Sequence, residues 1–319
     1  MQVLFRLVVA AALLVTQRAA HANDELPVTT VAPGVYVFPG VNRDAAPDNL
    51  GRVVNTGFIV GSDGVIVIDS GANLRHGEAI FAAITRTTTK PIKLLINTHP
   101  NPNFVLGNTA FAKRGIPILA TAATATAMAE RCPRCIEILT RSIGDEAMKG
   151  TEITLPQQRI TGSTSITIAG RTLALLHFGH ARTEGDLAVF DTASGTLFTG
   201  ELVYRGQIQH FAEARFSGWI TALEQLELQP IKILVPGRGD IGDATALATM
   251  HSYLKRLYAR VGAAYRDGHS PDETLTLAEV PEFFDWRGYT KNHPLNVQHA
   301  YFEHEADEVS QFSGSAVKP

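Results

Sequence analysis

The sequence has no excess of basic side chains. Its 319 residues include 28 Lys and Arg against 31 Asp and Glu, which gives a formal net charge of -3. A protein that binds nucleic acid by neutralising phosphates needs a basic surface, so the composition argues against that class. With 45% hydrophobic and 18% charged residues, the chain also lacks the composition of a collagen, a coiled coil or a disordered protein. We therefore expect a globular chain.

Long apolar runs are missing too, apart from residues 7–15. That stretch is much shorter than the roughly 20 residues that a helix needs to cross a bilayer. Arg6 precedes it, and Ala20 and Ala22 offer small side chains where a signal peptidase cuts. We interpret residues 1–22 as a secretory signal peptide. The mature chain is then expected to be periplasmic in a bacterium, without stable membrane insertion.

Cysteine is scarce, since Cys132 and Cys135 are the only two in the chain. In an oxidising compartment the leading interpretation of this pair is a short-loop disulfide. A redox-active dithiol is the alternative. A zinc site would need a second pair of cysteines, and the sequence has none.

Hydrophobic periodicity divides the chain into two halves, in each of which strands precede helices. Strands are expected within 29–41, 52–60, 65–68, 92–96, 116–119, 165–168, 171–176, 186–190, 196–198 and 231–235. Helices are expected within 73–89, 104–114, 121–148, 217–227, 243–267 and 292–307. Two such halves favour two sheets packed face to face with helices outside, a four-layer αββα sandwich of the α/β class. We expect one domain over 23–310, including a C-terminal helical extension, and a disordered tail over 311–319.

The strongest functional signal is the loop that follows the strand at 92–96. Residues 98–108 read Thr-His-Pro-Asn-Pro-Asn-Phe-Val-Leu-Gly-Asn. This stretch resembles the signature of the metallo-β-lactamase superfamily, Thr-His-x-His-x-Asp-His followed by Gly-Asn. In a gapless alignment His99 takes the place of the first ligand histidine. Asn101, Asn103 and Phe104 stand where the remaining His, Asp and His would be.

Further landmarks of that family follow in order. Asp69 ends a strand similar to the one that carries the family's buried Asp-x-Gly. Arg182 takes a ligand position in a segment similar to His-Thr-x-Gly-Asp. Glu201 replaces the Asp that bridges two metals, and Arg238 replaces the His of a Pro-Gly-His-Gly loop. The resemblance covers residues 30–307. The tail looks most like the periplasmic zinc metallohydrolases associated with quinoprotein relay systems.

The resemblance implies a metallo-β-lactamase-like fold whose dinuclear zinc site is altered. Phe104 cannot ligate a metal, and Arg182 and Arg238 bring positive charge into the former cation sites. We therefore expect no metal. Glu201 is expected to pair with the two arginines, because a buried carboxylate needs such partners. The cluster either plugs a dead site or holds a small anionic ligand, for which the candidate residues are Arg182, Arg238 and His180.

A shift of the alignment by two positions would make His180 the ligand in place of Arg182. One zinc ion could then bind to His99, His180 and Glu201, and the protein would be an active metallo-hydrolase. The shift breaks the match at 183–186, so we favour a non-catalytic binding or accessory protein. The resemblance suggests a quinoprotein dehydrogenase system as its partner. The sequence contains no nucleophile elbow, phosphate loop or nucleotide fingerprint that would supply another chemistry.

Overall fold

Two β-sheets form the body of the protein in the computed structural model, which describes residues 25–315. The predicted signal peptide and residues 316–319 lie outside the described residues. The first sheet has the strand order β1-β2-β3-β4-β5-β6-β7, and the second has the order β12-β11-β10-β9-β8. Their bounds are β1 (Thr29–Ala32), β2 (Val35–Phe38), β3 (Thr56–Val60), β4 (Val65–Ile68), β5 (Ile92–Ile96), β6 (Ile118–Thr121), β7 (Gln158–Ile160), β8 (Thr164–Ile168), β9 (Arg171–Leu176), β10 (Ala188–Asp191), β11 (Thr196–Phe198) and β12 (Ile233–Val235).

Alternate side chains of the central strands belong to different layers, as the two-residue period of a strand requires. On β4, Ile66 and Ile68 pack against the second sheet with Leu173 and Val189. Val65 and Val67 face the other way, against the helices α2 (Leu74–Thr87) and α4 (Asn108–Ala112). Because both faces of β4 are covered, its four residues are all apolar and buried.

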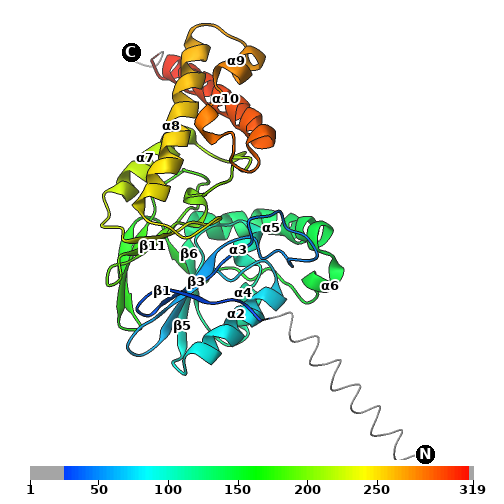
Figure 1. Cartoon of the computed structure of the whole chain (residues 1–319), viewed down its shortest axis with the longest axis vertical. Coiled ribbons are helices and arrows are strands. Elements are labelled where there is room, and N and C mark those ends of the chain that lie inside the picture. The colour runs from blue at the N-terminus through cyan, green and yellow to red at the C-terminus, as the bar shows by residue number, and fades with distance from the viewer. Residues whose placement is uncertain (1–24, 316–319) are drawn as a thin grey trace, which may run out of the picture.

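The outer face of the second sheet is covered by α7 (Phe216–Glu227) and α8 (Ala244–Arg266). Phe190 and Leu197 of the sheet share one apolar cluster with Trp219 of α7 and Leu254 of α8. The order helix, sheet, sheet, helix is visible in Figure 1. The predicted four-layer αββα architecture is therefore confirmed.

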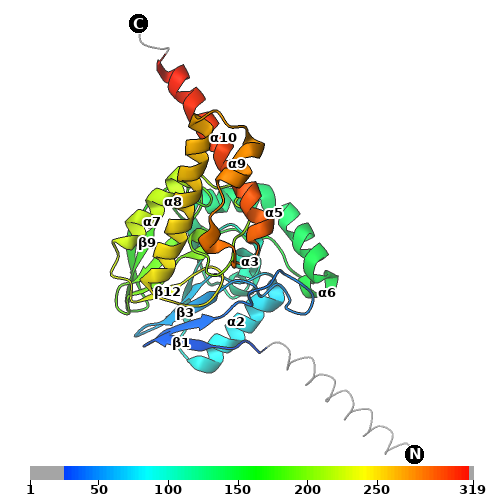
Figure 2. The same cartoon turned by 45° about the horizontal axis from the view of Figure 1, so that its top comes forward.

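The C-terminal helices project beyond the sandwich (Figures 1 and 2). They are the far end of α8, α9 (Pro271–Leu277) and α10 (Tyr289–Ser315), with a 3-10 turn, η2 (Pro281–Phe283), before α10. Histidines of α10 fasten it to the rest: His293 Nδ1 lies 2.9 Å from the Tyr253 hydroxyl, and His299 Nε2 lies 2.7 Å from the carbonyl oxygen of Ala214. These side chains thus serve helix docking. No helix of the described part of the chain is long and apolar enough to span a membrane.

Several expected boundaries differ from the structure. Between the expected helices 243–267 and 292–307 lies a further helix, α9, for which no element was expected. Ser270 and Glu273 form a capping box at its start, and Pro271 is its first residue. The expected helix 104–114 is two short helices, α3 (Pro102–Val105) and α4, and the helix 121–148 is divided at Gly144 into α5 (Ala122–Ile143) and α6 (Asp145–Met148). The tail predicted to be disordered from residue 311 is helical through Ser315, the last residue of α10.

Candidate functional site

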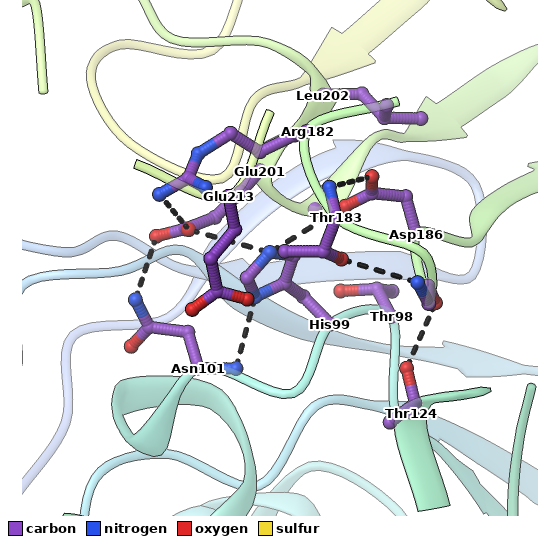
Figure 3. Close-up of polar contacts among 12 residues, drawn as sticks. Thr98, His99, Asn101, Thr124, Arg182, Thr183, Asp186, Glu201, Leu202 and Glu213 are labelled. Carbon is purple, nitrogen blue, oxygen red and sulfur yellow. Dashed lines mark hydrogen bonds and ion pairs between the residues drawn. The ribbon is translucent and has the colours of Figure 1, made fainter. Parts of the chain in front are cut away.

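The conspicuous polar residues lie where loops leave the strands at one edge of the sandwich. His99 follows β5, and Asp69 follows β4, its parallel neighbour. Glu201 lies in η1 (Gly200–Leu202) after β11, and Arg238 follows β12, the parallel neighbour of β11. Carboxyl ends of parallel strands meet at one edge, so residues far apart in sequence converge there. Arg182 joins them from the loop between β9 and β10 (Figure 3).

Asp69 holds the loop after β5 in place. Its carboxylate accepts hydrogen bonds from the Thr98 backbone N–H at 2.8 Å and from the Thr98 hydroxyl at 2.7 Å. Asp69 itself has a φ of 61°, a left-handed conformation that is rare for residues with a side chain. Burial raises its pKa to about 7, against the effect of these hydrogen bonds. The carboxylate is therefore a support of the loop that carries His99.

His99 is buried, with 3% of its surface exposed, and its ring is oriented by its own loop. The Asn101 backbone N–H donates to His99 Nδ1 at 2.9 Å. The hydrogen-bond network thus assigns the proton of the neutral ring to Nε2. That atom lies 3.4 Å from Asp186 Oδ1 and 3.5 Å from Glu201 Oε2. Burial lowers the pKa of His99 to about 4, so the ring is neutral at physiological pH.

Glu201 is the negative centre of the site and is 2% exposed. Its carboxylate lies 3.7 Å from Arg182 Nη2 and 3.4 Å from Arg238 Nε, and Asn101 Nδ2 donates to it at 3.2 Å. Burial opposes ionisation, but the attraction of His99, when protonated, and of Arg182 and Arg238 overcomes it and lowers the pKa of Glu201 to about 2. The expected Arg–Glu–Arg cluster is therefore present.

Asp186 approaches the same atom of His99 as Glu201 does, the ring nitrogen Nε2 (Figure 3). Its Oδ2 accepts the Thr183 backbone N–H at 2.6 Å, which fixes the loop after Arg182. Burial raises the pKa of Asp186 to about 7, although the Thr183 hydrogen bond and the charge of Arg182 act against it. Three atoms then face one another without a hydrogen-bond partner among the described residues: His99 Nε2, Asp186 Oδ1 and Glu201 Oε2.

Three other positions of the ligand-like loop are occupied by residues with structural contacts. The Asn101 side-chain oxygen caps α3 by accepting the Asn103 backbone N–H at 3.0 Å, and it also accepts the Asn103 side-chain N–H at 3.0 Å. Phe104 is completely buried in the apolar cluster that contains Met128 and Cys132. The loop thus uses these side chains for a helix cap and for the core.

His180 does not join the cluster. Its side chain is exposed, and its Nε2 lies 2.7 Å from the carbonyl oxygen of Glu213. The shifted alignment, which would combine His180 with His99 and Glu201, is therefore wrong, because Arg182 occupies the inner position of this loop. Over residues 25–315, no group of three or more His, Cys, Asp or Glu side chains is arranged to hold a metal ion.

The two cysteines are free thiols in the structure, so the expected disulfide is absent. They lie within α5, inside the helix expected over 121–148. Side chains three residues apart on a regular helix have Cβ atoms about 5–6 Å apart, whereas a disulfide brings them to about 4 Å. A regular helix thus keeps the two Cβ atoms about 1–2 Å farther apart than a disulfide does.

Two cavities of about 420 Å³ each adjoin the cluster, and both are lined by Asn101 and Arg182. The first, here called the cationic cavity, lies between the cluster and the start of α10. Arg238, Arg287 and Lys291 also line it. The second, here called the cysteine-side cavity, lies toward α5 and is lined by His99, Arg131, Arg134 and Cys135, among others.

Arg287 and Lys291 are site residues that the sequence did not reveal. They are four positions apart around the beginning of α10, far in sequence from the other cluster residues. Arg287 Nη1 lies 3.1 Å from Asp44 Oδ1, whereas Lys291 has no ion-pair partner among the described residues. The sequence shows these two residues only as the pattern Arg-x-x-x-Lys. That pattern does not indicate which part of the fold the start of α10 packs against.

Comparisons with known proteins agree with this architecture. A family model described as the metallo-beta-lactamase superfamily matches residues 50–238. A curated relative, a metallo-beta-lactamase type 2 of Bacillus sp. (strain 170), is 25% identical over 219 residues, or 67% of this chain and 75% of the relative.

Two solved structures extend the comparison at the level of the fold. A metallo-beta-lactamase from Pontibacter korlensis has a TM-score of 0.59 and 23% identity, and the alignment covers 72% of this chain and 99% of that one. The sec-alkylsulfatase Pisa1 from Pseudomonas sp. has a TM-score of 0.67 and 15% identity, covering 86% of this chain and 50% of its own. The chain therefore aligns with about half of the sulfatase.

Proposed function

Because the chain belongs to the metallo-beta-lactamase superfamily, we propose that it is a member which has lost the dinuclear zinc site and acts as a non-catalytic binding protein for a small organic anion. The observation that carries this proposal is that the buried guanidinium groups of Arg182 and Arg238 are ion-paired with Glu201. These arginines stand at positions that resemble metal-ligand positions of the family. We propose further that it acts in the periplasm as an accessory of a quinoprotein dehydrogenase system. The sequence resemblance of the tail and the signal-like first 22 residues support that part.

The side chains present do not fit a zinc centre. Zinc is held by thiolate, carboxylate and unprotonated imidazole groups. His99 Nδ1 accepts the Asn101 N–H, so the nitrogen that faces Glu201 carries the proton and offers no lone pair. Arg182 and Arg238 remain protonated and repel a cation. Their charges neutralise Glu201, the carboxylate that would otherwise attract one.

The cationic cavity has the charge that an anion requires. Four cationic side chains line it, against the two carboxylates of Glu201 and Asp44. Some N–H groups of the two guanidinium groups have no acceptor among the described residues. Arg182 donates through Nε and Nη2, and Arg238 through Nε and Nη1, while Arg182 Nη1 and Arg238 Nη2 make no hydrogen bond within residues 25–315. Two free guanidinium donors beside two further cations suit a doubly charged ligand, such as a phosphate monoester or a dicarboxylate.

The proposal is tested by titrating the mature protein with inorganic phosphate and with succinate. Calorimetry and the thermal unfolding midpoint are measured together, because a ligand that binds only the folded state raises the midpoint. Replacing Lys291 with Met removes one cation that has no ion-pair partner among the described residues, so the fold is not expected to change. A partly exposed charge pair contributes up to about 1 kcal/mol, which is about a fivefold loss of affinity.

The matched control is Lys113→Met, which removes an exposed lysine that lines neither cavity. Equal effects of the two substitutions would refute a specific site, and so would the absence of any rise in midpoint with either anion. The third ligand to be titrated is zinc. Stoichiometric zinc binding with a higher midpoint would overturn the proposed loss of the metal site.

A further inference from the structure

The second cavity beside the cluster contains a feature that anion binding does not use. Cys132 and Cys135 lie one turn apart on α5, and both side chains belong to the apolar cluster beneath the site. Their exposures differ: Cys132 is 1% exposed and Cys135 is 9% exposed. Of the two, only Cys135 lines the cysteine-side cavity, which His99, Asn101 and Arg182 also line.

We propose that Cys132 and Cys135 form a thiol–disulfide exchange site, in which Cys135 meets a small disulfide in the cysteine-side cavity and Cys132 resolves the product from the core side. Cys135 lines the cavity and can meet the disulfide, whereas Cys132 is almost completely buried and can react only with Cys135. This inference does not depend on the proposed anion binding, since the thiols do not line the cationic cavity.

The polar surroundings favour Cys135 as the attacking group. A hydrogen bond from the Cys132 thiol lowers the pKa of Cys135 and raises that of Cys132, and burial acts to raise the pKa of both. Arg131 lowers the pKa of both thiols through its charge, while Glu213 raises that of Cys135. Arg131 and Glu213 form an ion pair at the rim of the cavity. A thiolate is the nucleophile in exchange, so the thiol with the lowered pKa reacts first.

The reaction balances with a disulfide, RSSR, as the oxidant. The Cys135 thiolate attacks one sulfur, forms a mixed disulfide and releases RS⁻, which takes up a proton. Cys132 then loses its proton and attacks Cys135 Sγ, which forms the protein disulfide and releases the second RS⁻. Two protein thiols are oxidised, and one disulfide is reduced to two thiols. The lining includes Arg131, Arg134 and Arg182 against two glutamates, so an anionic disulfide is preferred.

The helix allows the second step and makes its product reversible. Bonding the pair requires their Cβ atoms to approach by about 1–2 Å relative to a regular helix. A bond closed against helix geometry is strained, and strained disulfides are reduced more easily.

The test uses the reduced, mature protein in oxidised glutathione, an anionic disulfide, followed by intact mass spectrometry. The wild type is expected to lose two hydrogens in one two-electron step and to regain them with dithiothreitol. Cys132→Ser is expected to retain one glutathione on Cys135, because the resolving thiol is missing. Cys135→Ser should react at least about tenfold more slowly, because its remaining thiol is almost completely buried.

Circular dichroism and the thermal midpoint establish that each variant is folded. Should a serine variant fail to fold, the wild type alone decides: brief exposure followed by acid quenching must trap the glutathione adduct on the peptide that contains Cys135. The proposal is overturned if Cys132 carries that adduct, if both serine variants react at equal rates, or if the wild-type thiols react only in denaturant.

A second comparison tests the role of the cavity. Arg134→Met removes a cation from the lining and should slow the reaction with oxidised glutathione, without slowing the reaction with uncharged dithiodipyridine. The matched control is Arg141→Met on the same helix, since Arg141 pairs with Glu137 at 3.4 Å and does not line the cavity. Equal rates in the two variants would show that the disulfide does not enter through this cavity.

Discussion

Replacing Glu201 with Gln should destabilise the protein by about 3 kcal/mol. The substitution keeps the volume of the side chain and removes the one carboxylate that is ion-paired with Arg182 and Arg238 among the described residues. Lowering the pKa of a carboxyl from 4.5 to about 2 corresponds to about 3 kcal/mol in favour of the ionised group in the folded state, which is an upper bound above pH 5 because protonated His99 supplies part of the shift. Breaking a buried ion pair by removing one partner costs a similar amount, about 3–5 kcal/mol.

The sign of the pH dependence follows from the direction of that shift. Because the pKa of Glu201 is lower in the folded state, its contribution is complete above about pH 4.5 and is lost only as the pH falls toward 2. The difference between wild type and variant should therefore be constant between pH 5 and 8. Urea unfolding followed by tryptophan fluorescence measures it, since Trp219 is completely buried.

Two comparisons isolate the cause. In the double variant Glu201→Gln with Arg182→Met, one of the unpaired charges is gone, so the loss should be smaller than the sum of the single losses. Phosphate should stabilise Glu201→Gln more than the wild type, because the freed guanidinium groups can bind it. Asp191→Asn is the matched control: Asp191 is buried and pairs with Arg171 at 3.1 Å, away from both cavities, so phosphate should not restore its stability. A Glu201→Gln variant within about 0.5 kcal/mol of the wild type would refute the reasoning.

Three further predictions concern a buried ring of the ligand-like loop, a buried histidine and the full set of replaced ligand positions. Phe104→Ala should cost about 3–5 kcal/mol in urea unfolding, because the ring is completely buried, and a neutral result would mean that the loop is open. Burial lowers the pKa of His76 to about 3, so its contribution to stability is present above pH 6.5 and is lost as the pH falls, by up to about 1.4 kcal/mol per pH unit. His76→Asn should reduce that slope between pH 6 and 4, and an unchanged slope would assign it to other groups. Finally, a sextuple variant should bind two zinc ions, measured as metal stoichiometry, while each partial reversion fails; a folded sextuple variant without zinc would place one of the aligned positions elsewhere. The six substitutions are Asn101→His, Asn103→Asp, Phe104→His, Arg182→His, Glu201→Asp and Arg238→His.

The layers of the fold could be predicted because each has a local hydrophobic pattern. The apolar runs at 65–68 and 92–96 are strands with those same bounds. The short strand β7 has no such pattern, since its residues are Gln158, Arg159 and Ile160 and it pairs only at the edge of the sheet. Its position depends on pairing with β6, a contact that no local pattern specifies.

The site could be predicted where a motif fixes the register, and not where tertiary packing alone brings residues together. The match at 183–186 selected Arg182 over His180, and the structure agrees, because Asp186 and Thr183 fold the loop so that Arg182 faces Glu201. Lys291 lines the cationic cavity because α10 docks on the sandwich, through contacts such as the hydrogen bond from the Asn292 side chain to the carbonyl oxygen of Ile208.

Under the proposed function, exchanging metal ligands for guanidinium groups changes what the site can do to a bound molecule, and not only what it binds. A bound zinc ion lowers the pKa of its water to about 7 and so supplies hydroxide. A guanidinium group donates hydrogen bonds but offers no lone pair that could take up a proton, and it keeps its own proton at any biological pH. Arg182 and Arg238 can therefore orient an anion without activating water beside it. His99 could accept a proton only at Nδ1, and the Asn101 N–H already occupies that atom. The side chains present thus favour binding over turnover.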